Sequence, residues 1–512
     1  MKRRLLAVGI VAAWFATLGL QARREFFQPE LARLEEAALF LSPGVNFYTL
    51  EMEDRSVGLA TSRLDTVPGG FVLEDFMTLE LPALGQTGRA VVRTEVKVSK
   101  ALVMQEFSFS LDSDVGEYRV DGRVDGDTIM TLDLDSGSGV ETLVQRLEAP
   151  PVFAAMVPIR VAIGDGLEVG QEVRVPVFDP STLSNRTVTV EVLEHDTMVV
   201  ADSAALDPSG RWTPARYDSI PVWRISETFG GLTIESWIDD DGRVISAESP
   251  VGFSMRKTEY ELARQSQEDA RLVAAGPGGD VILSTAIQSS VPLDDLETRA
   301  EVRYVLKGVD LTGFDLDGGR QELRGDTLIV RRDPWETADP GYELPYGRMD
   351  LRDALAAEPL IQSDDPQIQA RARSAVSGVF RRRNPKVVAE RLTGHVYNSL
   401  EKKITFSVPS ARHVMEAEEG DCNEHTVFYV ALARALGLPT RTAVGLAYVE
   451  GSFYYHAWPE VWMGEWMAVD PTFGQSPADA GHIRFVIGGL AQQVEIARLI
   501  GRLEIEVLEE DS

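Results

Sequence analysis

Residues 418–439 read EEGDCNEHTVFYVALARALGLP and contain Cys422, the single cysteine of the 512-residue chain. Asp421 and Glu424 stand three residues apart at the start of this stretch, which is the spacing of a capping box at a helix N-terminus. Apolar residues then recur at helical spacing, and Gly437 and Pro439 follow where a C-cap and a helix breaker belong. We therefore expect a helix that begins at Cys422.

The predicted position of Cys422 favours a reactive thiol. The first residue of a helix lies at the positive end of the helix dipole, which stabilises a thiolate. A single cysteine also cannot form an intramolecular disulfide. The alternative is a small apolar residue that fills a gap in the core. We expect Cys422 to be a nucleophile that is ionised at neutral pH.

Three strands joined by two tight turns are expected after this helix. The segments are TRTAVGLAYV (440–449), SFYYHAWPEVWM (452–463) and WMAVDPTFG (466–474), with His456 on the second and Asp470 at the end of the third. An unbulged turn would place Asp470 opposite about Pro459, so a bulge or twist must bring the carboxylate to the imidazole. Alone, His456 is typical of a core histidine and Asp470 of a turn aspartate. The ordered set Cys422, His456 and Asp470 instead predicts a catalytic triad, in which the imidazole deprotonates the thiol and the carboxylate orients the imidazole.

The same region resembles a known family. A Gly-x-Cys helix start is followed by an Ala- and Leu-rich helix ending in Gly-x-Pro-x-Arg, then by His-Ala-Trp-x-Glu and Trp-x-x-x-Asp-Pro-Thr. This order is similar to that of the transglutaminase-like superfamily, whose core is a papain-like cysteine fold. The resemblance covers about residues 360–488 and implies that Cys422 is the nucleophile, His456 the general base and acid, and Asp470 the residue that orients His456.

The resemblance also implies parts of the surrounding cleft. Trp458 and Trp466 would frame the cleft and contact substrate, although both could equally be core aromatic residues of the sheet. The backbone N–H of the nucleophile would form part of the oxyanion hole. His425, one helical turn after Cys422, could support the site or serve as a zinc ligand with His456. One cysteine and scattered histidines do not predict a metal site, and no calcium-loop pattern is present, so we expect neither metal nor cofactor.

The remainder of the chain predicts further β structure. From about residue 45 to 265, alternating segments such as FSFSL (107–111) and VTVEVL (188–193) are separated by expected turns such as Asp121-Gly122. A polar helix at 261–275 and a Gly/Pro hinge at 274–280 follow. We expect an α+β fold with a papain-like transglutaminase core at the C-terminus, preceded by antiparallel β-rich domains. The expected divisions are a signal peptide or N-terminal membrane anchor at 1–24, β-rich structure of unassigned role at 45–265, a linker at 266–280, a small β segment at 281–350, a transglutaminase-like catalytic domain at 360–490 and a C-terminal strand or tail at 491–512.

Composition and the first residues indicate where the protein works. The formal charge of −30 argues against nucleic-acid binding and against docking on anionic lipid. MKRR precedes the uncharged run Leu5–Leu20, a pattern typical of a secretory signal or an N-terminal anchor. We expect an extracytoplasmic protein, periplasmic or secreted, that contacts a membrane only through this segment.

Three classes of function remain open from the sequence. The first is thiol-dependent acyl transfer on amide bonds, most simply hydrolysis of a peptide or protein substrate outside the cytoplasm. A protein-crosslinking transglutaminase uses the same chemistry with an amine as the acceptor. The second class is a non-enzymatic envelope scaffold or binding protein, which would not need all three triad residues. The third, a redox-sensing cysteine, would not need His456 and Asp470 in this order.

Overall fold

The computed structural model describes residues 30–508, with gaps at 53–54, 84–85, 115, 127, 138, 165, 230–231, 251, 274–281 and 283–284. The expected signal or anchor at 1–24 and the hinge at 274–280 lie outside the described residues. Within the described part of the chain, no helix is long and apolar enough to cross a membrane. The structure is rich in strand, with 47% strand and 19% helix, and the large antiparallel sheet precedes the C-terminal region that carries Cys422.

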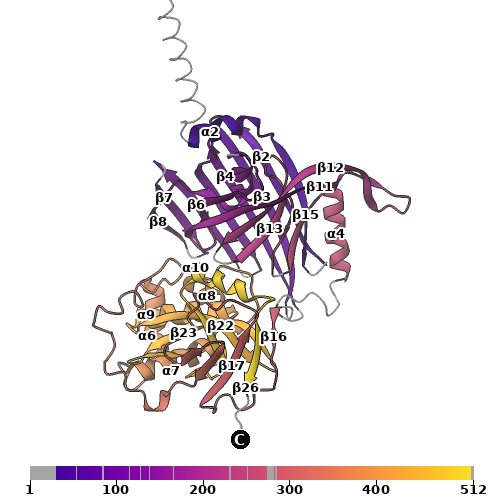
Figure 1. The fold of residues 1–512 in the computed structure, drawn as a ribbon. Coiled ribbons are helices and arrows are strands. Elements are labelled where there is room, and N and C mark those ends of the chain that lie inside the picture. The colour runs from indigo at the N-terminus through magenta and orange to yellow at the C-terminus, as the bar shows by residue number, and fades with distance from the viewer. Residues whose placement is uncertain are drawn as a thin grey trace, which may run out of the picture.

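One large sheet contains the first fifteen strands (Figure 1). Its order is β8-β7-β6-β5-β4-β3-β2-β1-β15-β14-β13-β12-β11-β10-β9, and only the β9–β10 pair is parallel. The strands are β1 (Gly44–Met52), β2 (Arg55–Val67), β3 (Gly70–Ala83), β4 (Gln86–Ser99), β5 (Met104–Ser113), β6 (Gly116–Asp125), β7 (Ile129–Asp135), β8 (Val140–Arg146), β9 (Val152–Phe153), β10 (Glu172–Asp179), β11 (Ser184–Leu206), β12 (Trp212–Phe229), β13 (Leu232–Ile238), β14 (Val244–Glu248) and β15 (Phe253–Thr258).

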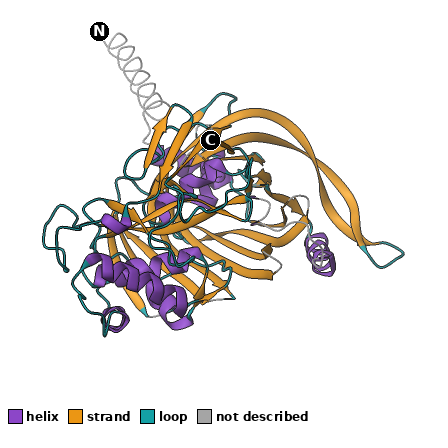
Figure 2. Cartoon of the chain, turned by 90° about the horizontal axis from the view of Figure 1, so that it is seen from below, coloured by secondary structure: helices purple, strands orange, loops and turns teal. Residues whose placement is uncertain are grey.

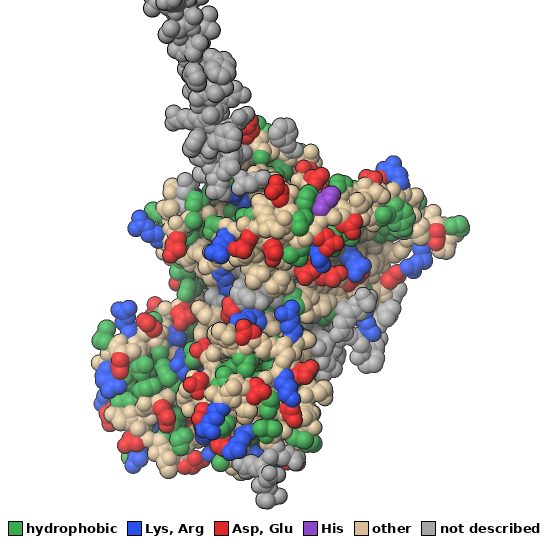
Figure 3. Space-filling model, in the orientation of Figure 1, with side chains coloured by type: hydrophobic (Ala, Val, Ile, Leu, Met, Phe, Trp, Pro, Cys, Tyr) green, Lys and Arg blue, Asp and Glu red, His purple; other side chains and the backbone are tan. Residues whose placement is uncertain are grey.

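The large sheet curves so that its two ends share one core. Alternate side chains of β4–β7 and of β10–β13 belong to the same buried cluster, which includes Phe107, Val120, Phe178 and Val190. The short helices η2 (Ala154–Met156) and α3 (Val157–Ala162) pack into this cluster. β11 and β12 extend beyond the sheet as a long hairpin (Figure 2). The outer surface carries acidic and basic side chains interspersed with each other (Figure 3).

Asp121-Gly122 is not a turn. Both residues lie inside β6, where Gly122 is opposite Phe107 of β5. A Cβ at Gly122 would collide with the Phe107 ring, which itself belongs to the core. The glycine therefore makes room for a cross-strand aromatic residue, a role that glycine can play within strands.

The polar helix expected near residue 261 is α4 (Tyr260–Val273), which packs against β1 and β2. Gln267 on this helix donates a side-chain hydrogen bond to Thr78 Oγ1 of β3. The expected linker at 266–280 was therefore placed too early, because residues 266–273 belong to the helix. Polar residues on its solvent face resemble a linker in composition, but its inner face is held by the sheet.

The C-terminal region is built on two smaller sheets. One has the order β16-β23-β22-β25, with β24 also paired to β23, and the other has the order β18-β19-β17-β26. Their strands are β16 (Ile287–Gln288), β17 (Glu301–Lys307), β18 (Gln321–Arg324), β19 (Thr327–Arg331), β22 (Thr440–Val449), β23 (Ser452–Trp462), β24 (Trp466–Ala468), β25 (His482–Ile487) and β26 (Glu504–Leu508). A shared apolar core joins the two sheets, with Tyr304 and Val330 from one and Leu446 and Phe453 from the other. The small β segment thus packs directly on the sheet that carries His456.

Helices cover the sheet that carries His456. They are α6 (Pro366–Ala375), α7 (Pro385–Ser399), α8 (Ala411–Ala417) and α9 (Cys422–Ala435), with α10 (Leu490–Gln493) and η4 (Val494–Leu499) after the last strand of this sheet. Three of them follow N-cap residues of types that favour a helix start. Asp365, Asn384 and Ser410 are N-caps whose side chains accept backbone N–H groups of the first turn.

The two parts of the molecule touch through α8 and the segment before it. The Phe406 ring lies against Gly88 of β4, where a Cβ would collide with it, and the His413 ring lies against Gly116 and Gly137. Val408 packs on the core of the large sheet. The contact therefore depends on glycines that leave space for side chains of the C-terminal region.

Candidate active site

Helix α9 begins at Cys422, as the sequence predicts. Asp421 is its N-cap and accepts the Asn423 backbone N–H at 2.8 Å, while Glu424 accepts the Asp421 backbone N–H at 3.0 Å. The capping box is thus complete, and both donors of the turn are satisfied. Val427, Phe428, Ala431 and Leu432 on the same helix are buried, which fixes the helix and hence its first residue.

The pKa values of the two carboxyl groups of the capping box are shifted in opposite directions. Burial and the neighbouring Glu424 raise the pKa of Asp421 well above its ordinary range. Although burial alone would raise it, hydrogen bonds from Asp421, Ser407 and Thr405 lower the pKa of Glu424. Asp421 is therefore the carboxyl group of this pair that takes up a proton first as the pH falls. The hydroxyl donors belong to the segment that contacts the large sheet.

The Cys422 thiol lies beside the strand that carries His456. The backbone of Ala457, the residue after His456, hydrogen-bonds to this thiol. On the next turn of α9, Thr426 Oγ1 donates to the Ala457 carbonyl at 3.0 Å. Two polar contacts with Ala457 therefore hold the start of α9 against β23, next to His456.

The expected thiolate at neutral pH is not what this environment favours. Burial raises the pKa of the Cys422 thiol well above its ordinary value, and the nearby Asp421 and Asp470 carboxyl groups act in the same direction. The Ala457 backbone lowers it only in part. The packing around the thiol therefore opposes the thiolate that the helix end favours.

His456 and Asp470 meet as the sequence predicts. His456 Nε2 lies 2.7 Å from Asp470 Oδ2, and both side chains are buried. The β23–β24 turn pairs Trp462 with Trp466 and Glu460 with Ala468, so Asp470 follows two residues beyond the strand. The other carboxylate oxygen of Asp470, Oδ1, accepts the backbone N–H groups of Thr472 at 2.6 Å and Phe473 at 3.0 Å. These hydrogen bonds hold the side chain so that Oδ2 points back to His456 on β23. Because Nε2 donates to this carboxylate, Nδ1 is the ring nitrogen that can accept a proton.

His482 is a site residue that sequence reasoning missed. Its Nε2 lies 2.9 Å from the same Asp470 oxygen, and its Nδ1 lies 3.0 Å from Asp479 Oδ1. Although burial alone would lower it, these two carboxylates raise the pKa of His482 to about 9. The same contacts lower the pKa of Asp479 to about 2, and His456 and His482 hold the pKa of Asp470 well below its ordinary range despite burial.

His482 reaches the site through sheet pairing. β25 pairs with β22, which in turn pairs with β23, and the rings of His456 and His482 lie 5.7 Å apart. The nearest sequence signal is Asp479, three residues before His482. Nothing in that spacing distinguishes a site pair from an ordinary turn, so the pairing of β25 was needed to find it.

Aromatic side chains enclose the imidazole. The His456 ring stacks on Phe473 with centroids 4.7 Å apart and planes 5° apart, and Phe473 is 38% exposed. Trp458 was expected to frame the cleft, but its side chain is completely buried against Ala443, Ala468 and Ala478 and cannot contact substrate. Trp466 is partly exposed and packs on Trp462 and Arg441. Its contact with substrate remains a prediction.

The remaining histidine near the site is neutral. Burial lowers the pKa of His425, and its Nδ1 lies 2.7 Å from the Asp421 carbonyl. Since a carbonyl can only accept, Nδ1 donates and Nε2 is a buried acceptor with no partner among the described residues. His456, Asp470 and His482 could together present three ligand atoms to a metal ion. A metal ion between these three residues would have to replace the hydrogen bond that each of the two histidine rings makes to Asp470.

Comparisons with known proteins identify the region around this geometry. Residues 379–471 match the family model of the transglutaminase-like superfamily. Among solved structures, a putative cysteine protease from Cytophaga hutchinsonii is 17% identical, with 41% of this chain and 90% of that chain covered and a TM-score of 0.28. A β-barrel-like protein of unknown function from Brucella abortus is 14% identical, with 43% and 95% covered and a TM-score of 0.28.

A third solved structure is the periplasmic domain of TgpA from Pseudomonas aeruginosa, 17% identical, with 37% of this chain and 75% of that chain covered and a TM-score of 0.23. The comparison with curated proteins gives no match. Because these TM-scores are below 0.5, the family match alone carries the assignment. Residues 379–471, which include Cys422, His456 and Asp470, thus match the core of the transglutaminase-like superfamily.

Proposed function

We propose that this protein catalyses thiol-dependent acyl transfer on amide bonds through Cys422, His456 and Asp470. The observation that carries the proposal is the position of the hydrogen-bonded His456–Asp470 pair, whose next residue, Ala457, contacts the Cys422 thiol. A buried carboxylate that fixes an imidazole next to a thiol is the arrangement needed to activate the thiol.

The first half-reaction forms a thioester. Cys422 Sγ attacks the amide carbonyl carbon while His456 Nδ1 takes the thiol proton. The raised pKa of the thiol suits this order, because the proton moves as the bond forms and no resting thiolate is required. The backbone N–H of Cys422, at the first position of α9, has no acceptor within the helix and can donate to the oxyanion. The C–N bond then breaks, and His456 protonates the leaving amine.

The second half-reaction releases the acyl group. His456 takes a proton from water, the oxygen attacks the thioester carbon, and the C–S bond breaks to give a carboxylic acid and the thiol. We propose water as the acceptor and a peptide or protein as the substrate, outside the cytoplasm. This location rests on the apolar run Leu5–Leu20. An amine acceptor in place of water would give a crosslinked product by the same steps. A non-enzymatic scaffold would catalyse neither hydrolysis nor crosslinking.

The test is acylation by p-nitrophenyl acetate. We expect a burst of one nitrophenolate per chain and an acetylated peptide that contains Cys422. Cys422→Ala should show no burst, with its fold checked by circular dichroism. Faster turnover and formation of an acetamide on adding a primary amine would indicate a crosslinking enzyme. The absence of a burst from the folded wild-type protein would contradict the proposal and favour the scaffold.

A further inference from the structure

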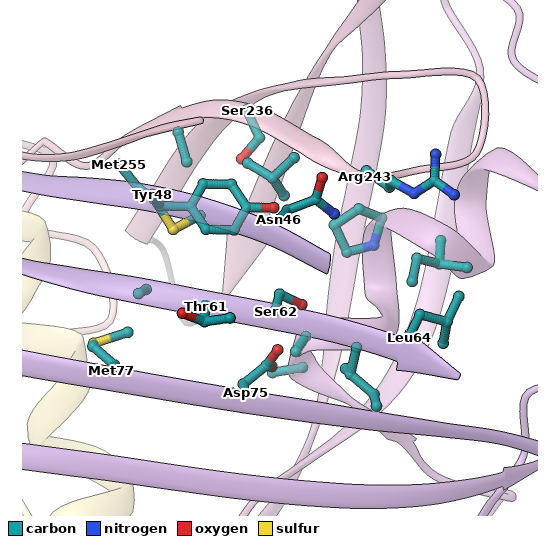
Figure 4. A pocket seen from close by; sticks show the side chains of 18 of the residues that line it. Asn46, Tyr48, Thr61, Ser62, Leu64, Asp75, Met77, Ser236, Arg243 and Met255 are labelled. Atoms are coloured by element: carbon teal, nitrogen blue, oxygen red, sulfur yellow. The ribbon is translucent and has the colours of Figure 1, made fainter. Parts of the chain in front are cut away.

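A cavity of about 300 Å³ lies in the large sheet, far from Cys422 in the sequence and outside the proposed active site. Figure 4 shows its walls, with Tyr48 of β1 and Ser236 of β13 on one side and Ser62 of β2 and Asp75 of β3 on the other. Its volume is at the lower end of the range for small-molecule sites, which is about 300–1,000 Å³. The cavity can therefore hold a small organic molecule.

Most of the lining is apolar. Four strands, β2, β3, β13 and β15, contribute apolar side chains, namely Leu64, Leu73, Met77, Ile234 and Met255. Flexible methionines adapt to different ligand shapes. This part of the wall suits a hydrocarbon portion of a ligand.

Three carboxyl groups interrupt the apolar wall, and two of them, Asp75 and Glu227, have no arginine partner, whereas Asp241 pairs with Arg243. Asp75 has a hydrogen bond from Ser62, but its Oδ1 is shielded from solvent and has no hydrogen-bond partner among the described residues. Glu227 has a hydrogen bond from Ser236. Burial raises the pKa of Asp75 to about 6 and that of Glu227 to about 7. An unpaired buried carboxylate oxygen is costly, so it marks a place where a donor from a ligand would bind.

The one arginine of the lining does not neutralise these carboxyl groups. Arg243 donates to the Ser42 carbonyl at 2.6 Å and pairs with Asp241 at 3.1 Å and with Asp239 at 3.7 Å. No ion pair among the described residues involves Asp75 or Glu227. The cavity therefore presents uncompensated negative charge next to an apolar wall.

We propose that this cavity binds a small organic ammonium ion that carries an apolar chain. The ammonium group donates to the free oxygen of Asp75 and the chain lies against the methionine and leucine side chains. An ammonium supplies both the hydrogen-bond donor and the positive charge that the cavity lacks, whereas an organic anion would add to the negative charge. The proposal is independent of Cys422 and its chemistry.

The test measures binding of n-octylammonium to the whole protein by isothermal titration calorimetry at pH 7.5, below the micelle concentration. The matched probes n-octanol and n-octanoate have the same chain with a neutral or a negative head group. We expect n-octylammonium to bind at least about tenfold more tightly than either, since a charge-assisted hydrogen bond is stronger than a neutral one. Equal affinity for n-octanol, tighter binding of n-octanoate, or no binding of n-octylammonium would overturn the proposal.

Two variants of the cavity carboxyl groups test where the ammonium group binds. Asp75→Asn keeps the side-chain shape and should weaken n-octylammonium binding at least about tenfold while leaving n-octanol binding unchanged. Glu227→Gln provides a second variant should Asp75→Asn fail to fold. Asp112→Asn, at an exposed position of β5 away from the cavity lining, is the control and should bind as the wild type does. Unchanged binding in both folded cavity variants would contradict an ammonium site at these carboxyl groups.

Discussion

Two pairs of buried carboxyl groups, one pair in each part of the molecule, have opposite surroundings. In the C-terminal region, Asp470 lies between two imidazoles, and Glu460 lies between Arg441 at 2.6 Å and Arg484 at 2.8 Å. These partners hold the pKa values of both carboxyl groups below their ordinary range despite burial. In the large sheet, Asp75 and Glu227 have only hydroxyl partners and their pKa values are raised.

The difference indicates two kinds of site. A carboxylate that is fully paired within the protein stays ionised and keeps its partners oriented, as a positioning group must. A buried carboxylate without a cation is costly when ionised, and that cost falls when a ligand brings the charge. Asp470 and Glu460 are therefore fully paired within the protein, while the cavity of the large sheet would gain stability from an occupant.

The largest effect is expected from Asp470→Asn. The amide cannot hold both imidazoles as the carboxylate does, so His456 loses the partner that fixes its tautomer and orientation. We expect acylation of Cys422 by p-nitrophenyl acetate to fall about 10³-fold or more, as measured by stopped-flow release of nitrophenolate. Glu465→Gln, on the turn between β23 and β24, is the control. A loss of less than about threefold in a folded Asp470→Asn protein would remove Asp470 from the account.

A smaller effect with a defined pH window is expected from His482→Gln. The pKa of His482 is about 9 in the folded protein and 6.5 is its ordinary value, so its stabilisation is complete below pH 6.5 and is lost as the pH rises through 9. This shift corresponds to about 3 kcal/mol of unfolding free energy. The variant should have a lower free energy of unfolding than the wild type at pH 6, and this difference should disappear by pH 10.

Hydrogen exchange of peptides from β22 and β25 measures this local stability at each pH. His195→Gln, in the large sheet, serves as the control and should not alter exchange in these strands. If the gap between His482→Gln and wild type were the same at pH 6 and pH 10, His482 would not be held as an imidazolium by Asp470 and Asp479.

The smallest effect has the opposite sign and belongs to Asp75→Asn. The pKa of Asp75 rises from 3.8 to about 6 on folding, so stability is complete below pH 4 and is lost as the pH rises through 6. Removing the ionisable group should stabilise β2 and β3 by about 1–2 kcal/mol at pH 8, after allowance for partial exposure. Hydrogen exchange at pH 5 and pH 8 checks this, with Asp112→Asn as control. Destabilisation at pH 8 would show that Asp75 has a partner in the folded protein.

Local signals in the sequence predicted much of the C-terminal region. Caps and helix starts depend on neighbouring residues, so the capping box of Asp421 and Glu424 could be recognised from spacing alone. The pairing of His456 with Asp470 also follows from a single turn between adjacent strands. Features that depend on distant parts of the chain were missed. His482 arrives through the pairing of β25 with β22, and Gly122 makes space for Phe107 of another strand.

The degree of burial of a side chain is also hard to predict from the sequence. Trp458 has the aromatic character of a cleft residue, yet the sheet encloses it on all sides. The helix end at Cys422 favours a thiolate, but the desolvation that opposes it depends on how closely β23 packs on α9. Neither enclosure can be judged from residue type, because both depend on tertiary packing.

The central claim is that His456 activates the Cys422 thiol. The direct measurement is the rate of iodoacetamide labelling from pH 6 to pH 10 in the wild type and in His456→Ala, where the single cysteine leaves no ambiguity about the labelled residue. The account predicts that labelling at pH 7 is about 10²-fold faster or more in the wild type than in His456→Ala. This difference in rate should narrow as rising pH ionises the thiol without the help of His456. Equal rates for the two proteins across the whole range would contradict the account.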